Sequence, residues 1–433
     1  MLAHFSPEDG LLFRVEETGK ILRRYYAIKK ALMKTQCGWF SRLPTFRLKY
    51  DCARHLYLDA KGAQHVAQRI TELMYGRGPF EEPTALNDFL RMMPRCLDLP
   101  EYLATIYLTV KQALVDAYHE HLKRTDPVFD APTIDVLEWL LRYDEEQIAW
   151  AKRELHQMFL RKEDKQRIAG WQGYLAALLA DAGGILGEGV HPSTPNAQPA
   201  TCDPSYAERP PYELPWEMRL DDCPRTSIDS EPGEIPADYH MVYAYYQEID
   251  IADLLCLIVY ESPDDLPIQY FVDLTRQAWD EVRHTTMGIR RLQELGFRLD
   301  QCGAPVHRWK AWRKMSNIER LGWLTQVGEA CSLAGKRDHI RKYLENSDTI
   351  SAAQIEYDIA DESGHVRFGS KWIPELLKRA ADPRTKRQVA VDGNRSFRTH
   401  MADILTAHGK PIPDGYLNEF QGCEDVADPA ASF

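Results

Sequence analysis

The pentapeptide Asp280-Glu281-Val282-Arg283-His284 and its near-copy Asp361-Glu362-Ser363-Gly364-His365 decide how this chain is organised. In each, a glutamate precedes a histidine by three residues, so both side chains lie on one face of an α-helix. A single Glu-x-x-His pattern is a weak signal, because a chain of this length contains roughly one by chance. Glu188 and His191 are such a case.

A fixed spacing distinguishes the two motifs from chance. A lone glutamate precedes each motif glutamate, and the interval is the same in both cases. One constant offset in residue number, which we call the repeat offset, leads from Glu248 to Glu329, from Glu281 to Glu362 and from His284 to His365. Two helical hairpins, each with a lone glutamate on its first helix and Glu-x-x-His on its second, predict four carboxylates and two imidazoles around one point. This is the ligand set of a dinuclear carboxylate metal site in a four-helix bundle.

Length and composition indicate a globular protein. The 433 residues are 44% apolar and include ten tryptophans, enough for two or three domains with sizeable cores. The net charge is −12 without a strongly basic run, which argues against broad binding to nucleic acid or to an anionic membrane. A local basic patch stays open. We therefore expect neither nucleic acid nor membrane as a partner.

Cysteine usage and the N-terminus indicate the compartment. The nine cysteines are scattered and never form a Cys-x-x-Cys pair, so they predict reduced thiols and neither a disulfide framework nor a zinc ribbon. The N-terminus lacks the charged and apolar runs of a signal peptide. No apolar stretch approaches the length of a membrane span. We expect a soluble, cytoplasmic protein.

Residues 1–182 show helical periodicity and essentially no strand alternation. The predicted helices cover about residues 12–34, 52–75, 99–122, 134–160 and 162–179. Asp144-Glu145-Glu146-Gln147-Ile148 is similar to the repeated motif with isoleucine in the histidine position, and Asp59-Ala60-Lys61-Gly62 lacks both ligands. This half is either a second, degenerate bundle of the same origin without a metal site, or an unrelated helical bundle with similar patterning.

The remainder divides into three parts. Residues 183–236 are rich in Pro, Gly, Ser and Thr and predict a linker, unless Tyr206, Tyr212 and Trp216 dock part of it onto a domain. Residues 237–382 carry both motifs on helices predicted at about 237–260, 267–295, 318–344 and 351–377. The interval between Glu281 and Glu329 is longer than the interval within either hairpin, which favours a crossover connection. Residues 383–433 form a tail with one short helix near residues 396–405.

Two kinds of residue near the six positions are further candidates. Asp280 and Asp361 lie four residues before the histidines. Ligating histidines usually donate their second ring N–H to a carboxylate, so we interpret both aspartates as histidine partners; the alternative is exposed surface charge. Tyr245 and Tyr357 precede Glu248 and Glu362 by about one turn and are candidates for a redox-active or pocket tyrosine. The alternative for both is an aromatic residue of the core.

The six residues resemble the ferritin-like di-iron carboxylate superfamily, which includes ribonucleotide reductase small subunits, acyl-carrier desaturases and rubrerythrins. The segment from Asp361 to Gly369, followed by Trp372, is most similar to a bacterial branch of this superfamily. The resemblance covers about residues 237–380 and is weak over the N-terminal half. It implies an all-α fold with a ferritin-like four-helix bundle.

The resemblance also implies a cofactor and a chemistry. It implies two iron ions, or manganese with iron, that activate dioxygen or peroxide, with the six residues as metal ligands. Four glutamates and two histidines suit such hard first-row ions. Which glutamates bridge is not decided by the sequence.

Three functions from different classes follow as hypotheses. The leading one is a di-iron oxidoreductase that hydroxylates, desaturates or N-oxygenates a small organic substrate, with dioxygen and an electron donor as partners. The alternatives are iron oxidation and storage, or a scaffold protein that retains a metal site without organic turnover. The sequence decides neither the substrate, nor the metal, nor whether the protein is a monomer or a homodimer.

Overall fold

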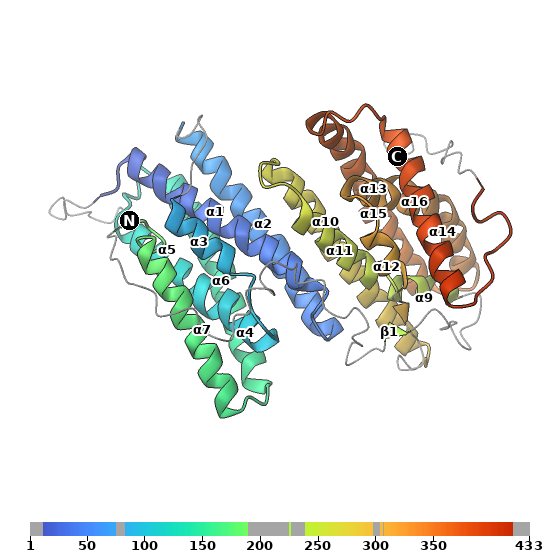
Figure 1. Cartoon of the computed structure of the whole chain (residues 1–433), viewed down its shortest axis with the longest axis horizontal. Helices are drawn as coiled ribbons and strands as arrows, with labels where there is room; N and C mark the ends of the chain where they lie inside the picture. The colour runs from blue at the N-terminus through green and yellow to red at the C-terminus, as the bar shows by residue number, and fades with distance from the viewer. Residues whose placement is uncertain are drawn as a thin grey trace. The chain divides into compact units, whose positions relative to one another are not determined.

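The computed structural model describes residues 12–74, 83–188, 225–226, 239–297, 304–305 and 307–418, which are almost entirely helical (Figure 1). Within these ranges the strands are the two-residue β1 (Arg225–Thr226) and β2 (Ala304–Pro305), which pair in parallel. The prediction of an all-α protein is confirmed. Over the same ranges, no helix combines the length and the apolar character that crossing a membrane requires.

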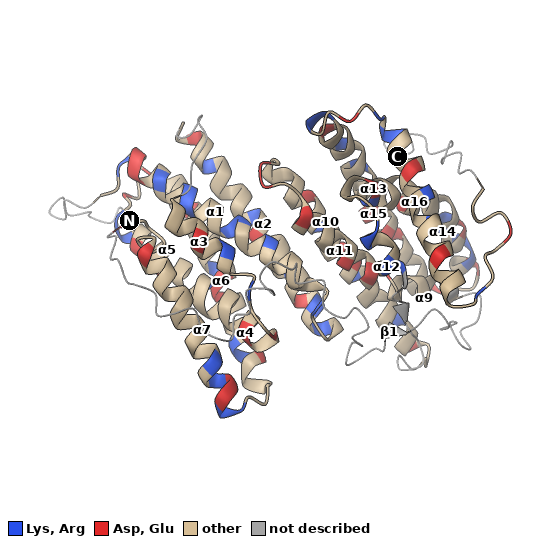
Figure 2. Ribbon diagram, in the orientation of Figure 1, with Lys and Arg blue, Asp and Glu red and all other residues tan. Residues whose placement is uncertain are grey.

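The chain forms two compact units. The first contains Met1–Trp39 and His55–Glu213, and the second contains Phe40–Arg54 and Leu214–Phe433. Most of the connection predicted at residues 183–236, including its three aromatic residues, lies outside the described residues. Acidic and basic residues are interspersed along the helices of each unit (Figure 2).

Helices build the first unit. The helices that lie wholly or mostly in it are α1 (Val15–Phe40), α2 (Phe46–Glu72), α3 (Thr84–Met92), α4 (Leu99–Leu103), the π-helical segment η2 (Ala104–Lys111), α5 (Gln112–Lys123), α6 (Ala131–Gln157) and α7 (Lys162–Asp181). The elements from α4 to α5 follow one another without a break and match one predicted helix. Asp98 caps this helix by accepting a hydrogen bond from the backbone N–H of Glu101. The nine-residue α3 is not predicted by the sequence pattern.

Four buried charges lie inside the first unit, each on a different helical element. Lys29 Nζ on α1 lies 2.8 Å from Asp59 on α2 and 2.7 Å from Asp144 on α6. Lys111 Nζ at the end of η2 lies 2.5 Å from Asp59 and 2.9 Å from Asp144. All four side chains are buried. Each carboxylate contacts both ammonium groups, so the charges cancel within the core, as burial of ions requires.

The second unit contains both repeated motifs. Its helices are α9 (His240–Tyr246), α10 (Ile249–Glu261), α11 (Ile268–Glu294), α12 (His307–Arg313), α13 (Asn317–Trp323), the π-helical η6 (Leu324–Gly328), α14 (Glu329–Glu345), α15 (Thr349–Arg379) and α16 (Lys386–Ala407). α10 packs against α11, α14 against α15, and α11 against both α9 and α15. α16 packs against α13.

Several helix boundaries differ from the sequence prediction. The helix predicted at 237–260 is divided into α9 and α10 by a turn at Gln247 and Glu248. The helix predicted at 318–344 contains the π-helical η6, which hydrophobic periodicity alone does not reveal. The short C-terminal helix begins earlier than predicted, at Lys386, because Thr385 and Gln388 form a capping box there. α12 is not predicted.

The cysteines correct one prediction. Cys331 is disulfide-bonded, so the prediction that all nine cysteines are reduced thiols is wrong at this residue. Cys37, Cys52, Cys96 and Cys256 are buried and are not disulfide-bonded. Sequence spacing does not report which thiols the fold brings within bonding distance, and that distance decides whether a disulfide forms.

Glycines allow close helix packing in the second unit. A Cβ atom at Gly288 on α11 would lie 2.5 Å from the backbone nitrogen of Tyr246 and 2.9 Å from the carbonyl oxygen of Val242, both on α9. A Cβ atom at Gly369 on α15 would lie 1.9 Å from Thr325 Oγ1 in η6. No side chain larger than hydrogen fits at either position without displacing a neighbour.

We expect Lys29→Met to destabilise the protein by about 3–5 kcal/mol, because Asp59 and Asp144 keep only one ammonium partner in a buried network. Lys20→Met on the same helix is the matched control. Its ion pair with Glu16 has side chains 60% and 68% exposed, and removal of such a pair costs less than about 1 kcal/mol. Scanning calorimetry of the full chain measures the melting temperatures of both variants. Equal melting temperatures for Lys29→Met and Lys20→Met would contradict the prediction.

We expect Gly288→Ala to destabilise the protein by about 1–3 kcal/mol, because the added methyl group meets backbone atoms that cannot rotate away. Gly335→Ala on α14 is the control. Nothing lies within 4 Å of a Cβ atom there, so the higher helix propensity of alanine should stabilise this variant. Urea denaturation should therefore give a lower free energy of unfolding for Gly288→Ala than for the wild type, and a higher one for Gly335→Ala.

Candidate metal centre

Two polar stripes on α11 and α15 face the interior of the second unit. On α11 the stripe consists of Gln277, Glu281, His284 and Gly288, and on α15 of Asp358, Glu362, His365 and Gly369. The spacing of three or four residues keeps each stripe on one helix face. Because α11 packs against α15, carboxylates and imidazoles from both helices meet inside the unit.

The two lone glutamates lie where their helices depart from regular α geometry. Glu248 is the N-cap of α10, directly after the turn that ends α9. Glu329 is the first residue of α14, directly after π-helical η6. π-Helical turns often occur at functional sites because they redirect the side chains around them. Both glutamates thereby join the residues of α11 and α15.

The structure brings five of the six predicted ligands into two groups. The first group, which we call triad 1, consists of Glu248, His284 and Asp358, and triad 2 consists of Glu281, Glu329 and His365. In each triad the ligand atoms lie within 4.8 Å of one another. The imidazole centroids of the two triads are 6.3 Å apart.

The imidazole Nδ1 atom faces the carboxylates in both triads. His284 Nδ1 lies 3.1 Å from Glu248 Oε2 and 3.4 Å from Asp358 Oδ1. His365 Nδ1 lies 3.2 Å from Glu281 Oε1 and 3.4 Å from Glu329 Oε1. The two Nδ1 atoms are therefore the histidine atoms available to a cation at each triad.

The sixth predicted ligand, Glu362, lies beside the triads and not in either one. Its carboxylate forms an ion pair with Lys336 of α14, and its Oε2 accepts a hydrogen bond of 3.1 Å from Ser332. Lys336 Nζ also lies 2.6 Å from Asp358 Oδ2. Lys336 thus connects Glu362 with triad 1.

Asp280 and Asp361 contact the histidines, but in a crossed arrangement. His284 Nε2 lies 3.3 Å from Asp361 Oδ2, and His365 Nε2 lies 3.4 Å from Asp280 Oδ2. Each aspartate therefore contacts the histidine of the other motif. Arg276 donates to both aspartates as well, at 2.8 Å to Asp280 and 3.4 Å to Asp361.

The two candidate tyrosines have different positions. Tyr245 is buried and its hydroxyl donates a hydrogen bond of 3.0 Å to Asp358 Oδ2, so it borders triad 1. Tyr357 is 68% exposed, and the prediction that it lines a pocket at the site is wrong. It lies next to Asp358 in the sequence, and one helical step rotates it by about 100° away from the stripe.

Sequence reasoning missed Asp358, Lys336 and Gln277. Asp358 lies four residues before Glu362 and seven before His365, which places it on the same helix face. Lys336 follows Glu329 by seven residues. Gln277 Nε2 donates a hydrogen bond of 2.7 Å to Glu329 Oε1. The available signal was this spacing of four and seven residues from the predicted ligands.

Burial and close contacts shift the pKa values of the triad residues. Burial raises the pKa of Glu248 and of Glu329 to about 7, and contacts with histidine only partly offset this. Burial also acts to raise the pKa of Glu281, but close contacts with both histidines outweigh it and lower the pKa to about 2. Burial acts to lower the pKa of His284 and of His365, yet the surrounding carboxylates raise it well above its ordinary value.

The donor atoms fit two divalent cations. Four buried atoms of the triads make no hydrogen bond within the described residues: Glu281 Oε1, Glu329 Oε2, Asp358 Oδ1 and His365 Nδ1. Buried polar atoms without partners are costly and are uncommon in native proteins. Carboxylate oxygens and imidazole nitrogens in this combination suit first-row divalent metals. Each triad offers three donors to one cation.

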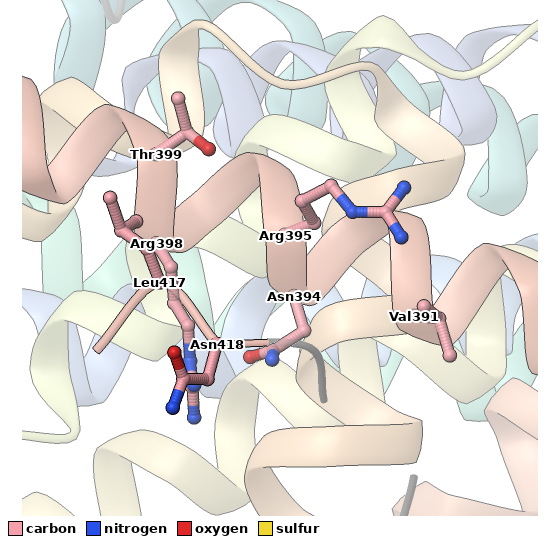
Figure 3. A pocket seen from close by; sticks show the side chains of 7 residues that line it. All are labelled: Val391, Asn394, Arg395, Arg398, Thr399, Leu417 and Asn418. Atoms are coloured by element: carbon pink, nitrogen blue, oxygen red, sulfur yellow. The ribbon is translucent and has the colours of Figure 1, made fainter. Parts of the chain in front are cut away.

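A pocket of about 240 Å³ lies elsewhere in the second unit, between α16 and the segment that follows it (Figure 3). Its lining includes Asn394, Arg395 and Arg398 of α16 and Asn418. No residue of the triads borders it.

We expect the metal-free protein to lose stability as pH rises from 5 to 8. Glu248, Glu329 and both histidines have folded-state pKa values above their ordinary values, so they bind protons more tightly when folded. Their contribution is complete below about pH 4.5 for the glutamates and 6.5 for the histidines, and is lost as pH rises through the folded-state pKa. The folded-state pKa of Glu281 is lowered instead, so its contribution to stability is lost as pH falls, and only below about pH 4.

The melting temperature of the chelator-treated protein between pH 5 and 8 tests this expectation. In Glu248→Gln/Glu329→Gln the fall with pH should be smaller, because two of the four groups no longer titrate. A melting temperature of the wild type that falls no more steeply than that of this variant would contradict the prediction.

Comparison with known proteins identifies a family for this chain. Residues 187–412 match the model of the family described as "Protein of unknown function (DUF455)". The matched segment is longer than half of the 433 residues and includes every residue of both triads. No curated protein and no solved structure matches the chain. The chain belongs to the DUF455 protein family.

Proposed function

We propose that the second unit is a ferritin-like four-helix bundle that holds two iron ions and uses dioxygen to oxidise a small organic molecule. The observation that carries this proposal is the pair of buried triads, whose carboxylates and imidazoles come from two helical hairpins related by the repeat offset. Ferritin-like proteins build dinuclear carboxylate centres from this set of residues on facing helices.

The helix packing supports the fold. α10 pairs with α11 and α14 with α15, and α11 also packs against α15. The two pairs are connected through α12, α13 and η6, and the length of this connection suits the crossover of ferritin-like bundles.

The triads indicate which residues would hold the two ions. Glu248 and His284 would bind one ion, and Glu329 and His365 the other. Glu281 is the best candidate for a bridging ligand, because its two oxygens face different histidines: Oε2 lies 3.7 Å from His284 Nδ1 and Oε1 lies 3.2 Å from His365 Nδ1. Iron bound here would supply the redox chemistry with dioxygen.

The surrounding residues prepare the ligands for this role. Asp361 and Asp280 would accept hydrogen bonds from the Nε2–H groups of His284 and His365, respectively, which leaves both Nδ1 atoms to bind metal. Arg276 neutralises these two aspartates from the outer side. Five of the six triad side chains are buried and Glu248 is partly buried, which limits the contact of the ligands with bulk water.

We extend the proposal to the first unit, as a bundle of the same origin in which two lysines take the place of the two metal ions. Lys111 is the last residue of the π-helical segment η2, and Glu329 directly follows the π-helical segment η6, so the two residues have similar places in their units. Lys29 precedes Lys111 by an interval that is only one residue longer than the repeat offset of the second unit. Asp59 and Asp144 begin the segments that correspond to the repeated motif. This unit would then need no metal.

The substrate, dioxygen and an electron donor remain the proposed partners. Iron oxidation with storage and a redox-inert scaffold are the competing functions that the same triads allow. Dioxygen consumption measured together with the formation of organic product separates all three functions.

We expect the full chain to bind two ferrous ions when reconstituted without oxygen, and Glu281→Ala to bind fewer than one with measurable affinity. Glu294→Ala is the control, because Glu294 lies at the end of the same helix, pairs with Arg290 and contacts neither triad. Iron is counted by colorimetric assay after gel filtration. Binding of well under two ions by the wild type, or unchanged binding by Glu281→Ala, would contradict a dinuclear site.

Exposure of the loaded protein to dioxygen with candidate substrates tests the oxidase activity. Consumption of dioxygen coupled to oxidised organic product supports the proposal. Rapid ferrous oxidation without product favours iron storage, and no reaction with dioxygen favours a scaffold.

A further inference from the structure

The repeat offset fails to preserve residue type at two buried positions next to the triads. Asp358 on α15 corresponds to Gln277 on α11, so a carboxylate replaces a neutral amide. Lys336 on α14 corresponds to Leu255 on α10, so an ammonium replaces an apolar side chain. All four side chains are buried. The second half of the repeat therefore gains one negative and one positive charge at the same place.

These two added charges contact each other. Lys336 Nζ lies 2.6 Å from Asp358 Oδ2, which also accepts the hydrogen bond of 3.0 Å from the Tyr245 hydroxyl. The other oxygen, Asp358 Oδ1, makes no hydrogen bond within the described residues and lies 3.4 Å from His284 Nδ1. One oxygen of Asp358 is thus held in place while the other is directed into triad 1.

Lys336 also determines the position of Glu362. It forms an ion pair with this carboxylate, and Ser332 on the same helix donates to Glu362 Oε2 at 3.1 Å. Glu362 is held outside triad 1 by these two contacts, and Asp358 occupies the third position of that triad. In triad 2 the third position is filled by Glu281, and Gln277 contacts Glu329 without adding charge.

Charge neutrality explains why the two substitutions occur together. Two divalent cations balance four glutamates and two neutral histidines. Asp358 adds one negative charge and Lys336 adds one positive charge, so the buried site stays neutral with both present. Either one alone would leave a buried charge without compensation, which is strongly unfavourable.

We infer that Asp358 is a metal ligand in place of Glu362 and that Lys336 is a positioning residue, which together make the two metal positions unequal. This inference rests on the proposed dinuclear site. The cation at triad 2 binds first and more tightly, because the described residues place no ammonium beside that triad. The cation at triad 1 binds second and more weakly, because the Lys336 ammonium repels it and holds Glu362 away.

Titration with Mn²⁺ alone tests the inference on the full chain. Electron paramagnetic resonance of free Mn²⁺ gives the number of bound ions, and calorimetry gives the two stepwise dissociation constants. For the wild type we expect two constants that differ by at least tenfold. Asp358→Asn should weaken the second step at least tenfold and change the first step less than threefold.

Lys336→Met should change the second step in the opposite direction, at least tenfold tighter, because the repulsive charge is removed. Mere damage to the fold cannot tighten binding, so this sign is diagnostic. The double variant Lys336→Met/Asp358→Asn removes both charges, avoids an unpaired buried group and should bring the two constants to within about threefold of each other. It serves as the informative protein if Lys336→Met does not fold.

The outcomes separate the two proposals. Wild type that binds no Mn²⁺ and no Fe²⁺ overturns the dinuclear site itself. Wild type that binds two Mn²⁺ ions with equal affinity, or variants at Asp358 and Lys336 that leave the second step unchanged, overturn the inference and leave the dinuclear site intact.

Discussion

Carboxylates buried inside helical bundles need cations beside them, and this constraint governs the interior of both units. In the first unit two lysines and two aspartates form a closed, neutral cluster. In the second unit Asp280 and Asp361 are paired with arginines, while the carboxylates of the triads and Glu362 face histidines and, among the described residues, one lysine, Lys336. Too few positive side chains face the inner carboxylates to neutralise them, so protons or metal ions must complete the balance.

The positions of these charges depend on local departures from the α-helix. Glu248 follows a break between two helices, Glu329 follows a π-helical segment, and Lys111 ends another. An inserted residue in a π-helical turn rotates everything after it relative to a regular helix. Irregular backbone therefore presents Glu248, Glu329 and Lys111 to their clusters, while the motif residues of α11 and α15 lie on regular helices.

The repeated register and its exceptions carry different information. Residues that obey the repeat offset define a site with two similar halves and agree with a centre for two like cations. Asp358 and Lys336 break the repeat offset and make the two halves unequal. Lys336 pairs with both Asp358 and Glu362, and Glu362 lies outside both triads.

The sequence by itself determined the all-α class and the cluster of buried glutamates and histidines, because short helical spacings and one repeated interval translate directly into positions on helix faces. It did not determine the crossed contacts of Asp280 and Asp361, which depend on how α11 faces α15. An aspartate or lysine on an amphipathic helix looks like surface charge until packing buries it, so Asp358 and Lys336 were found only in the tertiary structure. The disulfide of Cys331 was decided there too, since it depends on a distance between thiols that sequence spacing does not encode.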